Sequence, residues 1–124
     1  MKFERFEEIK AWQEARGLVK LVYQAINSNL SFRRDFRLSN QIQGAAVSTM
    51  ANIAEGFSRH SNKEFIQFLY ISKSSASEVQ SHLYVALDQK FIGQDAFKQI
   101  YEAADAVSKM VSNLIKYLSQ YSRR

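Results

Sequence analysis

The sequence contains no cysteine and no proline, and it has only four glycines and two histidines in 124 residues. The lack of cysteine excludes disulfides, thiolate chemistry and cysteine-ligated zinc, and it fits a reducing compartment. No apolar run approaches the roughly 18 residues that a membrane-spanning helix needs. The first residues, MKFERFEEIK, also lack the apolar stretch of a secretion signal. We therefore expect a soluble, cytoplasmic protein.

Apolar side chains are plentiful, since 46% of the residues are hydrophobic and nine of them are phenylalanine. A chain of this length and composition forms one domain with one core, which we expect to span residues 1–124. The formal net charge is +5. A basic balance of this size favours polyanionic partners only where the charges cluster on the surface.

Apolar spacing predicts the elements, because proline is absent and glycine is rare. The apolar positions repeat at alternating steps of three and four residues, which is the seam of a helix in a bundle. The longest seam runs from Phe97 to Tyr121, and another from Phe65 to Ala86. We predict four helices, at about 6–27, 37–57, 61–87 and 94–121. The short connections favour antiparallel neighbours, and hence an all-α, up-down-up-down four-helix bundle.

The segment ANIAEGFSRHSNKEF, residues 51–65, joins the second and third predicted helices. Its simplest interpretation is a structural joint, in which Gly56 or Ser58 relaxes the backbone and Phe57 closes the end of the core. Ser61 then starts the next helix with a capping box. Asn52 and Glu55 are either solvated or part of a polar network that fixes how helices or subunits meet.

Catalytic and DNA-reading alternatives for this segment have less support. Glu55, His60 and Glu64 supply titratable groups, but no nucleophile, metal motif or phosphate loop accompanies them. Glu78 and His82 have the spacing of half a metal site, without the second half that a di-iron bundle needs. A helix-turn-helix at 42–75 would have a very long second helix with few groups for reading bases. We expect no enzymatic activity, no metal and no cofactor.

Three segments carry a resemblance to a known family: FEEIKAWQEARGLVKLVY, LSNQIQGAAVSTMANIAEGFSR and KEFIQFLYIS. They resemble the four-helix-bundle proteins encoded in intervening sequences of bacterial 23S ribosomal RNA genes. The resemblance implies ring-like homopentamers with no established enzymatic activity. It also implies a fold similar to that of the accessory variability protein of diversity-generating retroelements, a basic pentamer that works with a reverse transcriptase and nucleic acid.

The family pattern falls on particular residues of this chain. Its Asn-Ile-Ala-Glu-Gly matches residues 52–56, its early tryptophan matches Trp12, and its Lys-Glu-Phe matches residues 63–65. The chain departs from the pattern at Gln43 and Gly44, where relatives often have arginine before Ala-Ala. It departs again at Thr49 and Met50, where relatives often read Ile-Pro. The loss of arginine counts against nucleic-acid binding by that face.

An up-down topology would place most basic residues at the two ends of the bundle, as one basic patch at each end. A fivefold ring would repeat each of these patches five times. We expect a scaffold that binds RNA or DNA weakly and non-specifically through phosphate contacts. The alternative is an adaptor for a protein partner, like the retroelement accessory protein with its reverse transcriptase. The residues expected to contact nucleic acid are Arg33, Arg34, Arg37, Arg59, Lys63, Arg123 and Arg124. Those expected to serve structure or assembly are Trp12, Asn52, Glu55, Gly56 and Phe57.

Overall fold

The computed structural model describes residues 3–121, and this part of the chain is helical without any strand. The all-α class predicted from the sequence is thus confirmed. The elements are a 3-10 turn η1 (Phe6–Glu8) and five helices: α1 (Lys10–Asn27), α2 (Leu30–Arg34), α3 (Phe36–Phe57), α4 (Asn62–Asp88) and α5 (Gln94–Ser119).

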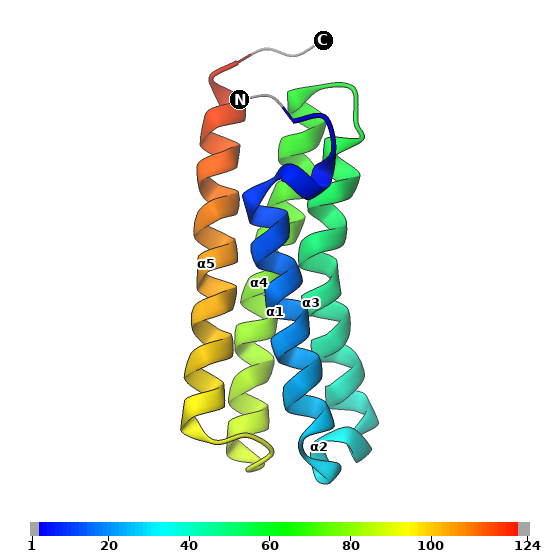
Figure 1. The fold of residues 1–124 in the computed structure, drawn as a ribbon, viewed down its shortest axis with the longest axis vertical. Helices are drawn as coiled ribbons and strands as arrows, with labels where there is room; N and C mark the ends of the chain where they lie inside the picture. Colours follow the sequence, from blue (N-terminus) through cyan, green and yellow to red (C-terminus); the bar gives the residue numbers. More distant parts are fainter. Residues whose placement is uncertain (1–2, 122–124) are drawn as a thin grey trace.

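Four of the helices are long and lie side by side in one bundle (Figure 1). In Figure 1 the chain runs down α1, up α3, down α4 and up α5, and the short α2 lies at the lower end. Helix α3 packs against α1 and α4, and α5 packs against the same two helices on the opposite side. Each long helix therefore buries one stripe against two neighbours and leaves an outer face.

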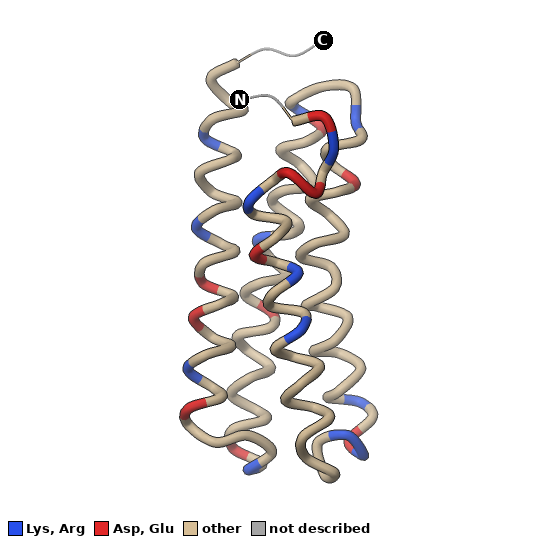
Figure 2. Tube along the Cα trace, viewed as in Figure 1, with Lys and Arg blue, Asp and Glu red and all other residues tan. Residues whose placement is uncertain are grey.

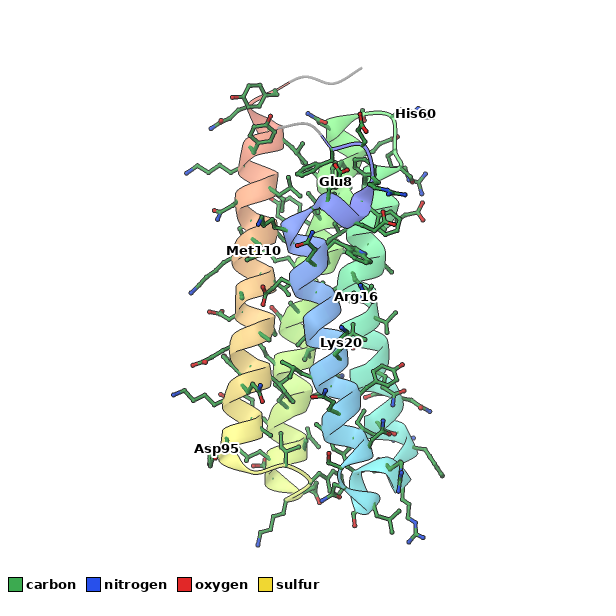
Figure 3. All side chains as sticks on the ribbon, viewed as in Figure 1. Glu8, Arg16, Lys20, His60, Asp95 and Met110 are labelled. Atoms are coloured by element: carbon green, nitrogen blue, oxygen red, sulfur yellow. The ribbon has the colours of Figure 1, made fainter. Side chains whose placement is uncertain are left out.

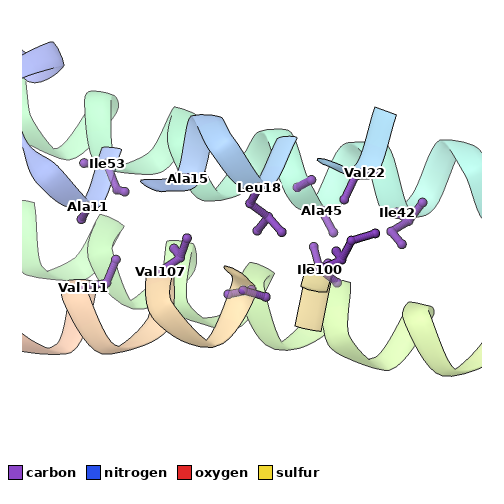
Figure 4. Packing of buried hydrophobic residues seen from close by; sticks show 14 of the residues in the cluster. Ala11, Ala15, Leu18, Val22, Ile42, Ala45, Ile53, Ile100, Val107 and Val111 are labelled. Atoms are coloured by element: carbon purple, nitrogen blue, oxygen red, sulfur yellow. The ribbon is translucent and has the colours of Figure 1, made fainter. Parts of the chain in front are cut away.

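The core follows the apolar spacing of the sequence closely. All seven positions of the predicted α4 seam, from Phe65 to Ala86, are buried. In α5 the seam is buried from Ile100 to Leu118, with Phe97 half-buried and Tyr121 exposed at its ends. Figure 4 shows small and branched side chains from facing helices meeting along the bundle axis. Burying such a stripe is the main stabilising term for an amphipathic helix.

The structure departs from the predicted boundaries near Ile9 and at residues 28–36, and side-chain caps explain the second departure. The predicted first helix breaks at Ile9, whose backbone is extended, so only η1 forms before α1 begins at Lys10. The predicted connection at 28–36 contains α2, which starts where the Asn29 side chain accepts from the Phe32 N–H at 2.9 Å. Asp35 caps α3 in the same way, accepting from the Leu38 N–H at 3.0 Å. These side-chain oxygens satisfy backbone donors that a helix start leaves without partners.

The predicted cap at Ser61 is present, because the Ser61 hydroxyl accepts from the Glu64 N–H at 3.2 Å and α4 begins one residue later. Along residues 3–121 no helix has the length and apolar character that crossing a membrane would require.

Candidate nucleic-acid interface

The α2–α3 corner at the lower end of the bundle carries three of the predicted nucleic-acid contacts. Figure 2 shows Lys and Arg positions gathered at this corner. Arg33, Arg34 and Arg37 are all exposed, and none of the ion pairs formed within residues 3–121 involves them. The nearby carboxylate of Asp35 is engaged with the start of α3. The guanidinium groups are therefore available to phosphate oxygens.

Buried aromatic packing holds this corner in place. Phe32 is 1% exposed and stacks on Phe91 of the α4–α5 connection, with 5.3 Å between ring centroids. The Arg33 N–H donates to the Asn29 carbonyl at 3.0 Å, which closes the turn of α2. With Phe32 directed into the core, its neighbours Arg33 and Arg34 lie on the outer surface of α2.

The α3–α4 turn lies at the opposite, upper end of the bundle (Figure 1), and its two basic residues differ in their contacts. Arg59 forms an ion pair with Glu55 at 2.8 Å and lies over the Phe68 ring at 4.6 Å from its centroid. Lys63 is exposed and lines an open groove of about 640 Å³ beside Tyr70 and Tyr121. Arg59 is thus already engaged, whereas Lys63 faces solvent.

The predicted contact residues consequently do not form one patch on a single chain. Arg33, Arg34 and Arg37 lie at one end, and Arg59 and Lys63 at the other. Arg123 and Arg124, also predicted, lie outside the described residues. Between the two ends, residues 38–54 of α3 carry no charge at all, and Figure 2 shows this stretch as an unbroken tan trace.

Asn52 belongs to a polar network between helices, one of the two possibilities left open by the sequence. Its amide donates to the Ser48 carbonyl and to the Ser48 hydroxyl, both at 2.9 Å. The Ser48 hydroxyl in turn lies 2.8 Å from the Ser75 hydroxyl of α4. Glu55, by contrast, is exposed and pairs along its own helix with Arg59. Asn52 thus supports the Ser48–Ser75 contact between α3 and α4 from within α3.

Gly56 has a different role from the one predicted. It lies inside α3 and has no positive φ, so it does not relax the backbone. A Cβ at this position would lie 2.8 Å from Phe65 Cδ1 and 2.9 Å from Phe68 Cβ. Glycine is needed because α4 passes too close for any side chain. Phe57 lies at this end of the core, half-buried and edge-on to Phe65 at 6.3 Å between centroids.

Trp12 anchors the start of α1 against η1. Its ring meets Phe6 edge-on at 5.1 Å between centroids, and the Arg16 guanidinium lies over it at 5.9 Å. Figure 3 shows Arg16 and Lys20 along the outer side of α1. The tryptophan is half-buried, so its role is to pack the amino-terminal turn onto the bundle.

Three features escaped the sequence analysis. Phe36 is exposed beside the three arginines, although aromatic residues elsewhere in the chain are mostly packed.

The other two features are hydrogen bonds between helices. The buried Ser72 hydroxyl donates to the Thr49 carbonyl at 2.7 Å, adding a second polar contact between α3 and α4. Asn62 donates to the Leu118 and Tyr121 carbonyls at 3.3 and 2.8 Å, and so caps the end of α5. The run SKSSAS, residues 72–77, did indicate from its small side chains that a neighbouring helix or subunit could approach α4 closely.

The titratable groups considered for catalysis are dispersed. His60 lies at the exposed α3–α4 turn (Figure 3), and His82 pairs with Glu78 at 3.4 Å on α4. Within residues 3–121 no three His, Asp or Glu side chains gather closely enough to hold a metal ion.

The fold and surface together define a class: an all-helical bundle with exposed arginines clustered at the α2–α3 corner and a long uncharged stretch in α3. The chain belongs to the 23S rRNA-intervening sequence protein family, whose model matches residues 7–113. A comparison with curated proteins found no match.

A solved structure supports the same assignment. It is the crystal structure of a protein of unknown function from the S23 ribosomal protein family of Bacteroides thetaiotaomicron. The two chains share 25% sequence identity and superpose with a TM-score of 0.71. The match covers 86% of this chain and 95% of the other.

Proposed function

We propose that this protein is a non-enzymatic, cytoplasmic, self-assembling scaffold that binds RNA or DNA weakly and without base specificity. The observation that carries nucleic-acid binding is the set of three exposed arginines at the α2–α3 corner, Arg33, Arg34 and Arg37, outside every ion pair of the described chain. Phosphate contacts of this kind hold a polyanion without reading its sequence.

Self-assembly is proposed from the outer face of α3 and α4. Six of the nine exposed large hydrophobic residues lie on these two helices, and residues 38–54 add no charge. Of the four long helices, α3 has the longest uncharged stretch, whereas α1, α4 and α5 each carry charges of both signs (Figure 2). An apolar strip bordered by charged faces is typical of a contact between copies. We define the α3–α4 outer face by Val47, Ile71 and Val85. Tyr70 and Tyr84 lie on the side of α4 that faces α5. The number of five copies rests on the family resemblance.

Assembly would strengthen the proposed binding. One α2–α3 corner offers three cations against one carboxylate, which is a weak patch by itself. A closed ring would present the corner once per copy, and a long polyanion could contact several corners at once. The expected affinity is therefore a property of the assembly.

Neutralising the corner tests the binding proposal. A variant carrying Arg33→Gln, Arg34→Gln and Arg37→Gln should bind RNA and duplex DNA at least roughly tenfold more weakly. Its plot of log affinity against log salt should also be shallower, because fewer counterions are released. The measurement is fluorescence anisotropy across a salt series.

The matched control removes three charges elsewhere, by Lys10→Gln, Lys20→Gln and Lys116→Gln on α1 and α5. These lysines are exposed and lie outside the ion pairs of residues 3–121. The proposal predicts a smaller loss for this control. Equal losses would show that net charge alone matters, and salt-insensitive binding by the wild type would refute phosphate recognition.

The second candidate is a protein-binding adaptor, and the exposed apolar residues of the α3–α4 outer face are the observation that favours it. A partner polypeptide could cover the same apolar strip that we assign to self-assembly. The two functions differ in a simple measurement. A scaffold for nucleic acid should purify with excess absorbance at 260 nm, whereas an adaptor should purify without nucleic acid and retain one defined protein partner.

A further inference from the structure

We infer that the α2–α3 corner binds single-stranded nucleic acid, with Phe36 stacking on an unpaired base between phosphates held by its arginine neighbours. This inference rests on the proposed nucleic-acid binding. It adds that the ligand is single-stranded and that Phe36 is the residue that selects it.

Phe36 is unusual in its exposure. Its surface is 71% exposed, the largest value among the large hydrophobic residues of the described chain. It takes no part in the aromatic or cation–π contacts formed within residues 3–121. Phe32, four residues earlier, is in contrast buried and stacked on Phe91. A single exposed phenylalanine would by itself need no explanation. This one, however, lies among three exposed arginines.

Arginines flank the ring on both sides in the sequence Arg33-Arg-Asp-Phe-Arg37. All three are exposed and unpaired, as described above, while Asp35 is engaged in capping α3. A cationic group beside a free aromatic face is the combination that single-stranded nucleic acid requires: the cations hold successive phosphates and the ring stacks on a base.

The local structure favours a preformed site. The caps from Asn29 and Asp35 fix the starts of α2 and α3, and buried Phe32 anchors the segment between them. Phe36 occupies the first position of α3, directly after its cap. Little conformational freedom in the backbone would be lost on binding, which improves affinity for a given set of contacts.

Stacking also selects the strand. In a duplex the base faces are covered by neighbouring bases, so a protruding ring has no face to meet, and only phosphate contacts remain. A single strand exposes both phosphates and base faces. Anionic lipid is the competing ligand for arginines beside a phenylalanine. Phe36 and the exposed Leu30 of α2 together supply far less apolar area than stable membrane attachment needs.

Replacing the ring tests the inference while leaving the charges in place. We expect Phe36→Ala to weaken binding of a twelve-nucleotide uridine RNA by roughly 10- to 100-fold. Its affinity for a twelve-base-pair duplex should change by less than about twofold, since the phosphate contacts remain. The salt slope for the single strand should equal that of the wild type. Phe36→Trp should restore the affinity, because tryptophan also stacks.

Tyr23→Ala is the matched control, because it removes an exposed aromatic ring of α1, outside the α2–α3 corner. It should bind both nucleic acids as the wild type does. Circular dichroism and solution mass confirm that each variant is folded and assembled.

The other possible outcomes contradict the inference, and they distinguish a failure of base stacking from a failure of nucleic-acid binding. If Phe36→Ala binds the single strand normally, or weakens both ligands equally, stacking is refuted while nucleic-acid binding survives. If the wild type binds neither nucleic acid, the proposed function fails as well. If it binds vesicles containing phosphatidylserine instead, and Phe36→Ala abolishes that binding, the corner recognises lipid.

Discussion

Gly56 lies where the last turn of α3 meets the first turns of α4, with Phe65 and Phe68 closing over it. The Cβ of an alanine there would lie under 3 Å from both side chains and 3.1 Å from the Phe65 carbonyl oxygen. One of the neighbouring atoms belongs to the backbone and another is a Cβ, so neither can swing away as a flexible side-chain end would. Packing, rather than turn geometry, therefore requires glycine at this position.

Gly56→Ala should lower the free energy of unfolding by about 1–3 kcal/mol, since forced overpacking outweighs the better helix propensity of alanine. Gly17→Ala is the control, because Gly17 lies inside α1 with nothing within 4 Å of the added Cβ. That substitution should raise the free energy of unfolding by about 0.5–1 kcal/mol. Urea denaturation at one protein concentration measures both. A Gly56→Ala protein as stable as Gly17→Ala would mean that α3 and α4 are not in close contact there.

At the scale of elements, α3 and α4 are joined by hydroxyl groups as well as by apolar packing. The Ser48 and Ser75 hydroxyls meet at 2.8 Å, and the Ser72 hydroxyl reaches the Thr49 carbonyl. Serine is small enough for close approach, and a bond across the contact fixes the register of one helix against the other.

A double-mutant cycle with Ser48→Ala and Ser75→Ala should show a coupling free energy of about 0.5–1.5 kcal/mol. The physical reason is that either single substitution already removes the shared hydrogen bond. As a control, Ser48→Ala combined with Ser119→Ala should be additive, because Ser119 bonds only within α5, to the Lys116 carbonyl. Chemical denaturation gives all the free energies. Zero coupling for the first pair would contradict the proposed register contact.

The sequence predicted the long helices because their apolar seams encode burial directly, as the seven buried α4 positions show. It missed α2, since five residues hold no periodicity and the helix depends on the Asn29 cap and the anchoring of Phe32. The role of Gly56 was also out of reach, because the space around it is set by a helix packed from a different part of the chain.

The candidate site was predictable only in part. Clustered arginines in a loop are visible in any sequence, and Arg33, Arg34 and Arg37 indeed lie exposed at one corner. Whether a basic side chain is already paired depends on its neighbours in space, and Arg59 proved to be engaged with Glu55 and Phe68. The exposure of Phe36 depends on how α2 directs Phe32 inward, which the pattern of residues does not reveal.

At the scale of the whole molecule, the two ends and the α3–α4 outer face have separate roles in our account. The outer face joins copies, and the ends then present repeated basic groups to a polyanion. Binding strength should therefore depend on assembly even for variants whose arginines are intact.

The most direct test of self-assembly through α3 and α4 is the solution mass by light scattering, for the wild type and for Ile71→Glu. We predict a wild-type mass of about five times the 14.3 kDa of one chain. We also predict a fall towards 14.3 kDa for Ile71→Glu, because a carboxylate would be buried in an apolar contact. Tyr23→Glu, on the outer side of α1, should keep the wild-type mass. A wild-type mass of one chain, or an Ile71→Glu protein that stays assembled, would contradict the account.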